Sequence, residues 1–263
     1  SFDIVRQVYR RVYPMEANMD DLPPDEDVID GAIERFNDAD GPVFLWVHQM
    51  GSHRPYGTGD DAIPPKLDRK AEAAGGRHWF GSSEVTDDEK SLIESKYRDA
   101  LGRVDARIER VMESIDSEDP IFAFAADHGD EFGEEEFFYH QGYRRRVPDT
   151  VIQVPVVLSG VDTVGERLSL VDIAPTLAES VGIDAPEEWQ GTDLTSERTE
   201  ETITVAPWHE KATVAWQDFE RKLVARDADA TFREDGEEVA VERSDVSDEV
   251  EQQLQNLGYT DAG

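Results

Sequence analysis

Three short runs of consecutive apolar residues, separated by helix-like segments, constrain the fold of this 263-residue chain more than any other feature. Runs of this length are typical of strands covered on both faces, as strands are in parallel sheets. Strands that alternate with helices predict an α/β layered domain with a mostly parallel central sheet. The three runs lie at residues 43–47, 121–126 and 154–158.

The segments around these runs carry the periodicity of amphipathic helices. In the clearest one, apolar residues recur at steps of three and four over residues 93–115. A Thr and a Glu at the ends of residues 86–89 match a capping box at its start. A shorter helix is predicted over residues 28–36, and another over 170–181 with Gly182 as its stop.

After about residue 200 the pattern changes to short segments in which apolar and polar residues alternate. Such segments predict an antiparallel meander, and a final helix is expected over residues 248–257. We therefore expect an α/β domain over residues 1–199 and a small C-terminal subdomain over 200–263. The alternating segments are 202–206, 211–217, 221–226 and 230–233.

Charge excludes several classes of function. The chain has 60 acidic and 26 basic residues, a formal net charge of −34. Phosphate binding needs clustered Lys and Arg, so nucleic acid is not an expected partner. No apolar run is long enough for a membrane span. Dispersed carboxylates suit a high-salt cytoplasm, as in a halophilic archaeon, because salt screens their repulsion. With no cysteine, disulfides and thiolate sites are excluded.

Histidines beside the apolar runs are the candidates for chemistry. Asp127 and His128 directly follow the second run, where open α/β sheets bind ligands. They could hold a divalent cation, or they could form only a turn or a helix cap. His53, after the first run, could bind an anion or donate a proton, whereas His48 fits a half-buried structural position. His140 by itself has the pattern of a surface histidine.

Taken together, several segments resemble the sulfatase family in order and spacing over residues 25–195. That resemblance implies an alkaline-phosphatase-like fold and metal-dependent hydrolysis of sulfate esters, as in arylsulfatases. The small C-terminal part is similar in plan to the C-terminal subdomain of sulfatases. The segments are PVFLWVHQMGSHRPY, YRDALGRVDARIERVMESI, IFAFAADHGDEFGEEEFFYHQGY, VPVVLSG and LVDIAPTLAESVGIDAPEEWQGTDL.

The resemblance also implies roles for individual residues. Asp127 and His128 match two ligands of the active-site cation, and His53 matches a histidine that contacts the substrate. His140 matches a Lys or His near the scissile oxygen, a proton donor or charge stabiliser. One divalent cation is expected, Ca²⁺ first and Mg²⁺, Mn²⁺ or Zn²⁺ as alternatives. The expected partner is a small anionic sulfate ester, and the sequence does not indicate an oligomeric state.

The sequence departs from the family pattern in two places. Gly51 and Ser52 stand where the family has Asp-Pro, and no Cys/Ser-x-Pro-x-Arg motif occurs. We therefore expect the chain to be the C-terminal portion of a sulfatase whose formylglycine nucleophile lies on a preceding N-terminal segment. Two alternatives remain: a phosphodiesterase, phosphonate hydrolase or phosphoglycol transferase of the same superfamily, and a non-catalytic sulfatase-like binding protein.

Overall fold

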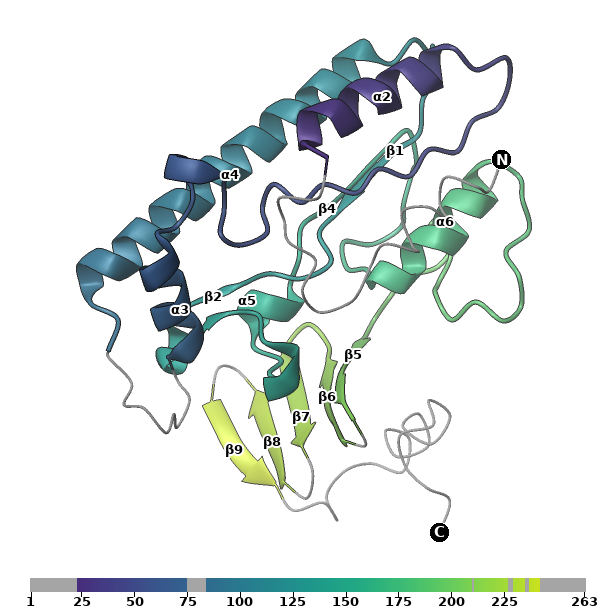
Figure 1. Cartoon of the computed structure of the whole chain (residues 1–263). Helices are drawn as coiled ribbons and strands as arrows, with labels where there is room; N and C mark the ends of the chain where they lie inside the picture. The colour runs from purple at the N-terminus through teal and green to yellow at the C-terminus, as the bar shows by residue number, and fades with distance from the viewer. Residues whose placement is uncertain (1–22, 75–83, 210, 227–228, 235–236, 242–263) are drawn as a thin grey trace. The chain divides into compact units, whose positions relative to one another are not determined.

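A computed structural model describes residues 23–74, 84–209, 211–226, 229–234 and 237–241 (Figure 1). The chain divides into two compact units. Unit 1 comprises Ser1–Asp68 and Asp87–Glu118, and unit 2 comprises Arg69–Thr86 and Asp119–Gly263. Helix α3, Pro65–Ala73, spans the boundary between them. The division into residues 1–199 and 200–263 stays a prediction.

Two helices form the framework of unit 1. These are α2, Asp25–Asn37, and α4, Asp87–Ser114, with the short 3₁₀ helix η2, Gly59–Asp61, between them. Both helices begin with acidic residues, which interact favourably with the positive end of the helix dipole. Arg107 of α4 joins them through ion pairs of 3.2 Å to Asp25 and 2.7 Å to Glu26. The predicted amphipathic helix over residues 93–115 is thus confirmed.

The first apolar run does not form the buried strand that its composition predicts. Residues 43–47 are extended but pair with no strand in the described part of the chain. Phe44 is 80% exposed and Trp46 73% exposed, while Leu45 and Val47 between them are partly covered. A buried strand requires a neighbouring backbone to pair with, and the described residues provide none here. The prediction of a buried strand over residues 43–47 is therefore wrong.

Unit 2 pairs the other two apolar runs, but in antiparallel fashion. Strand β1, Phe122–Ala125, pairs with β4, Val156–Ser159. In both strands half-buried and exposed residues alternate, so each strand is covered on one face only. Our inference that these runs are covered on both faces is therefore wrong. A mostly parallel central sheet is therefore not evident in the described residues. The chain returns through a short helix, α5, Asp149–Ile152, and enters β4 against the direction of β1.

The connection from β1 to α5 contains the shortest elements of the structure. Strands β2, Glu131–Phe132, and β3, Phe138–Tyr139, form a small antiparallel ladder. The 3₁₀ helix η3, Glu134–Glu136, joins them, and η4, Gly142–Arg144, follows β3. These elements carry the candidate site described below.

The remaining helix of unit 2 agrees with the sequence pattern. The 3₁₀ helix η5, Leu170–Asp172, continues into α6, Ile173–Ser180. Gly182 follows with a φ of 74°, a left-handed conformation that glycine adopts without strain. The helix predicted over residues 170–181 and its glycine stop are both confirmed.

A five-stranded antiparallel meander closes the described chain, as the alternating pattern predicts. Its second strand is buried at three consecutive residues, Thr213, Val214 and Ala215, so it is covered on both faces there. The helix expected over residues 248–257 lies outside the described residues. No described helix has both the length and the apolar character needed to cross a membrane. The strands are β5 Thr202–Trp208, β6 Lys211–Gln217, β7 Arg221–Arg226, β8 Asp229–Glu234 and β9 Glu237–Val241.

Candidate functional site

The turn after β1 places Asp127 and His128 at the end of a strand, as we expected. Gly129 follows, and its N–H donates a hydrogen bond of 2.8 Å to the Val151 carbonyl of α5. A Cβ on Gly129 would lie 2.0 Å from the Thr150 carbonyl oxygen. Glycine is therefore required here because the turn and α5 approach closely, and α5 fixes the direction in which the turn points its side chains.

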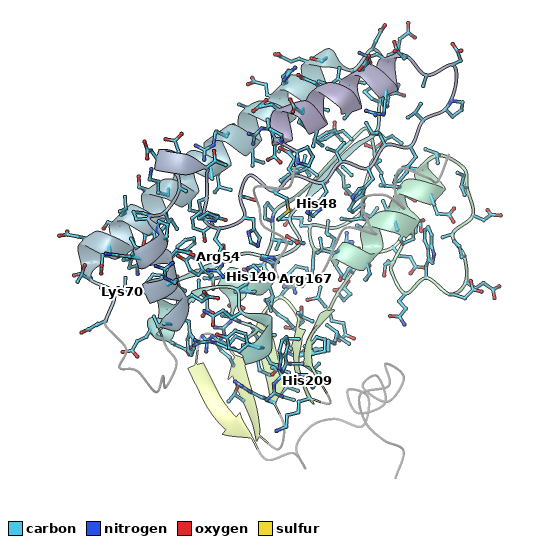
Figure 2. All side chains as sticks on the ribbon, viewed as in Figure 1. His48, Arg54, Lys70, His140, Arg167 and His209 are labelled. Atoms are coloured by element: carbon cyan, nitrogen blue, oxygen red, sulfur yellow. The ribbon has the colours of Figure 1, made fainter. Side chains whose placement is uncertain are left out.

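Three side chains of unit 2 converge next to this turn: His128, Asp130 and His140. Each offers a ligand atom, and these atoms all lie within 4.8 Å of one another. The rings of His128 and His140 have centroids 3.5 Å apart. Figure 2 labels His140 of this group. We call these three residues the His-Asp-His cluster.

Hydrogen bonds set the tautomers of both histidines. Nδ1 of His140 lies 2.9 Å from Oδ1 of Asp130, whose side chain is only 8% exposed. Nδ1 of His128 lies 3.0 Å from the carbonyl oxygen of Gly129. Carboxylate and carbonyl oxygens accept hydrogen bonds, so both Nδ1 atoms carry the proton. Nε2, the second nitrogen of each ring, is then the atom that would bind a ligand.

The strand ladder that brings His140 back to Asp130 contains a buried carboxylate that is paired with an arginine. Glu131 is 2% exposed and accepts hydrogen bonds from Nε of Arg146 at 3.0 Å and from Nη2 at 2.7 Å. The Arg146 guanidinium also lies 3.8 Å from the centre of the Phe137 ring. Burial alone would lower the pKa of Arg146, but its contacts with Glu131 outweigh burial and raise that pKa. Arg146 thus stays charged and links Glu131 of β2 to the ring of Phe137, the residue before β3.

The donor set of the His-Asp-His cluster fits a divalent cation. Two imidazole nitrogens and one carboxylate oxygen are ligands that Zn²⁺, Mn²⁺ and Fe²⁺ accept, whereas Ca²⁺ prefers oxygen alone. Asp127 lies at the edge of the cluster, 75% exposed, with Oδ2 3.8 Å from Nε2 of His128. His128 is therefore the residue shared by the pair expected from the sequence and the cluster found in the structure.

His53 belongs to unit 1 and is not part of the His-Asp-His cluster. It is half-buried in the loop after residues 43–47, and its Nδ1 lies 2.6 Å from the Arg54 carbonyl oxygen. Arg54 in turn pairs with Asp68 at 3.3 Å. The neighbouring His48 is exposed, with Nε2 3.1 Å from the Met50 sulfur, and not half-buried as we expected.

Sequence reasoning missed Asp130 and the pair of Glu131 and Arg146. Asp130 stands only two residues after His128, a separation that in an extended segment returns a side chain to the same side of the chain. That proximity was the available signal. No sequence signal indicated the pairing of Arg146 with Glu131, because β2 and β3 have only two residues each.

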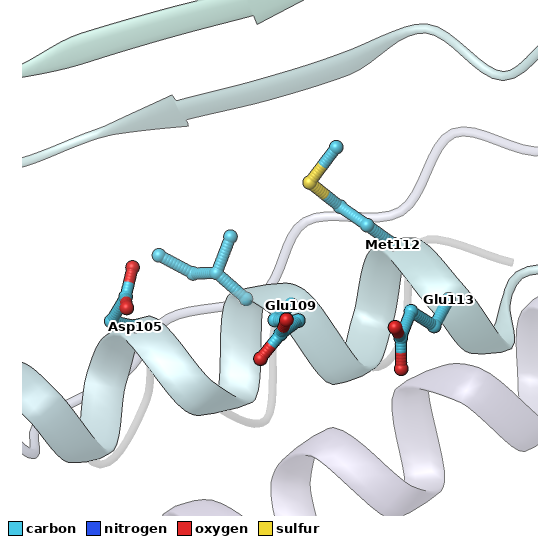
Figure 3. Close-up of a pocket in the computed structure, with 5 residues that line it drawn as sticks. Asp105, Glu109, Met112 and Glu113 are labelled. Atoms are coloured by element: carbon cyan, nitrogen blue, oxygen red, sulfur yellow. The ribbon is translucent and has the colours of Figure 1, made fainter.

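A depression of about 360 Å³ lies on α4, away from all of these residues in the sequence (Figure 3). One helix supplies its entire lining, with side chains at successive helical turns. Three of its five residues are acidic, and no second element brings a converging polar group. It therefore carries no functional interpretation. The lining residues are Asp105, Ile108, Glu109, Met112 and Glu113.

Comparison with known proteins bears on the family. No curated protein matches the chain. Among solved structures, it matches the phosphonate monoester hydrolase SpPMH from Silicibacter pomeroyi, at 15% identity and a TM-score of 0.44. That match covers 81% of this chain and 49% of the other, so the chain spans about half the length of that protein. The family model described as Sulfatase matches residues 4–183, a range that contains His53 and the whole His-Asp-His cluster. By that match over most of its length, the chain belongs to the sulfatase family.

Proposed function

We propose that this chain is part of a metal-dependent hydrolase that cleaves sulfate esters. The observation that carries the proposal is the convergence of His128, Asp130 and His140 inside the range matched by the Sulfatase model. A family match alone would also fit a degenerate member without a site. Three ligand-capable side chains within 4.8 Å, one of them a buried carboxylate, favour a functional member.

His128 is the central metal ligand in this proposal. Its second ligand is Asp127, as the family resemblance implies, or Asp130, as the cluster suggests. A bound divalent cation would neutralise negative charge that develops on the ester during cleavage. Ca²⁺ is the ion that the resemblance implies, whereas the imidazole of His128 favours Mn²⁺ or Zn²⁺.

His140 and His53 are the substrate-contacting residues of the proposal. The Asp130 carboxylate orients the His140 ring through Nδ1, and this ring would contact the substrate or its leaving oxygen. His53 would contact the anionic group of the ester. The proposed partner is thus a small sulfate ester. The imidazoles would bind this anion locally, although the net charge of the chain is −34.

Calorimetric titration with Mn²⁺, Ca²⁺ and Mg²⁺ tests the metal site directly. We expect binding by the wild-type chain, and at least about tenfold weaker binding after His128→Ala. Comparing Asp127→Ala with Asp130→Ala identifies the carboxylate ligand. Asp184→Ala, which removes an exposed carboxylate in the loop after α6, is the matched control and should bind as the wild type does. Unchanged affinity in His128→Ala would refute the site.

A second candidate function is hydrolysis of a phosphodiester or phosphonate ester. The observation that favours it is the imidazole content of the cluster, which suits Mn²⁺ or Zn²⁺ more than Ca²⁺. Turnover of 4-nitrophenyl sulfate and of bis(4-nitrophenyl) phosphate by the full-length protein separates the two. A kcat/KM at least tenfold higher for the phosphodiester would reverse our ranking. A protein that turns over neither ester and binds no metal would be a non-catalytic binding protein.

A further inference from the structure

Two half-exposed aromatic rings lie against each other at the end of the C-terminal sheet. Tyr143 of η4 is 47% exposed, and Trp208 at the end of β5 is 41% exposed. Their ring centroids are 6.1 Å apart, with an angle of 65° between the ring planes. This edge-to-face arrangement is a favourable one for aromatic pairs. We call the two residues the aromatic pair.

Tyr143 is held in place by contacts with its hydroxyl and with its ring. Its hydroxyl donates a hydrogen bond to Oε1 of Gln141, and Nε2 of Gln141 donates to the Glu72 and Phe138 carbonyls at 3.0 and 3.2 Å. The Arg144 guanidinium lies 5.5 Å from the centre of the Tyr143 ring. A ring fixed in this way loses little conformational entropy when a ligand packs on it.

Trp208 is fixed by the β5–β6 hairpin. It pairs in the ladder with Lys211, and the ring of His209 meets it nearly edge-on at 5.1 Å. His209, labelled in Figure 2, has a φ of 54°, which turns the chain sharply at this point. Arg145 joins the two segments by donating a hydrogen bond of 3.3 Å to the Ala212 carbonyl. Both rings thus lie on segments that strand pairing or hydrogen bonds position.

Tyr143 of the aromatic pair is close along the chain to the His-Asp-His cluster. Tyr143 is three residues from His140, so their Cα atoms are at most about 11 Å apart. The 3₁₀ turn over Gly142–Arg144 shortens that distance further. In a sulfate ester the ring of an aryl or sugar alcohol begins one oxygen atom beyond the sulfur. A ring of that kind could reach the pair while its ester group lies at His140.

We propose that Tyr143 and Trp208 form a stacking subsite for the ring of the ester's alcohol portion, an aryl or pyranose ring. The proposal rests on the proposed function for the position of the ester, but ring binding itself requires no hydrolysis. An uncharged stacking contact also suits this surface, because neither dispersion nor ring stacking is weakened by the carboxylates or by salt.

Calorimetric titrations of the chain with four probes test this subsite. The probes are phenol, 4-nitrophenyl sulfate, glucose 6-sulfate and the ringless ethyl sulfate. One aromatic contact is worth about 0.5–1.5 kcal/mol, so Trp208→Ala should weaken ring probes about 2- to 13-fold. Ethyl sulfate should bind equally to both proteins, and Trp208→Phe should restore most of the loss. Trp189→Ala is the matched control, since Trp189 is also exposed, at 46%, but lies after α6.

The probes separate the possible outcomes. Loss confined to 4-nitrophenyl sulfate and phenol identifies an aryl ring as the ligand, and loss confined to glucose 6-sulfate identifies a pyranose. Equal affinity of wild type and Trp208→Ala for every ring probe, or equal weakening of ethyl sulfate, would overturn the subsite. Retained Trp208-dependent binding of phenol by a protein that hydrolyses no sulfate ester would refute the proposed function and leave ring recognition standing.

Discussion

Replacing Gly129 by alanine tests the contact that orients the candidate site. The new Cβ would lie 2.0 Å from the Thr150 carbonyl oxygen, whereas Cβ contacts under 3.0 Å essentially do not occur. The turn and α5 must therefore separate by about 1 Å, which stretches the hydrogen bond of 2.8 Å from Gly129 to Val151. Overpacking of this kind costs about 1–3 kcal/mol, and the lost hydrogen bond about 1 kcal/mol more.

We expect Gly129→Ala to lower the free energy of unfolding by about 2–4 kcal/mol, measured by urea denaturation at fixed salt. Calorimetry should also show metal affinity reduced at least about tenfold, because the turn carries His128. Gly102→Ala is the matched control: Gly102 lies within α4 with nothing near its Cβ position. That change should stabilise the helix by about 0.5–1 kcal/mol. An unfolding midpoint and metal affinity equal to those of the wild type would refute the close approach.

Three further changes test other parts of the structure. Lys222→Met leaves Asp149 with Arg233 alone, so urea denaturation should show a loss of about 1–3 kcal/mol, the cost of the lost Lys222 hydrogen bonds. Burial alone would raise the pKa of Asp149, but hydrogen bonds from Lys222 and Arg233 outweigh it and lower that pKa. Its contribution is therefore complete above about pH 4 and lost on further acidification, so the stability difference between wild type and Asp149→Asn should shrink in that window. Turnover of an anionic ester by the full-length protein should rise with salt, because screening reduces repulsion from the net charge of −34; a steady fall would contradict this.

The helices could be predicted from the sequence because their signal is local. The apolar period over residues 93–115 and the Gly182 stop require no knowledge of distant partners, and both are observed. Strand pairing is not local. Residues 43–47 and 122–125 have similar composition, yet only the second finds a partner strand in the described chain, and that partner is antiparallel. Apolar composition therefore predicted extended backbone but neither pairing nor direction.

The candidate site could be predicted only in part for a related reason. Asp127 and His128 were identifiable because they follow a strand directly. Asp130 contacts His140 because the β2–β3 ladder reverses the chain between them, and a ladder this short leaves no periodic signal. Tyr139, at the end of this ladder, has a left-handed conformation with a φ of 64°. The proximity of His140 to Asp130 thus arises from tertiary structure.

The C-terminal sheet supports the candidate site as well as completing the fold of unit 2. Nζ of Lys222 in β7 donates hydrogen bonds of 2.8 Å to the Val147 carbonyl and 2.6 Å to Asp149 at the start of α5. Helix α5 in turn accepts the hydrogen bond of Gly129 through Val151. The sheet therefore fixes α5, and α5 fixes the turn that carries His128.

If this mechanical connection holds, Lys222→Met must weaken metal binding as well as lower stability, although Lys222 is no metal ligand. A variant of equal stability loss outside the connection separates the two effects. Asp172→Ala is suitable, because the Asp172 carboxylate accepts hydrogen bonds from Ser169, Thr192 and Thr199 and none from α5. At temperatures where both variants are folded, only Lys222→Met should lose metal affinity. Equal affinities would show that the sheet stabilises unit 2 without positioning the site.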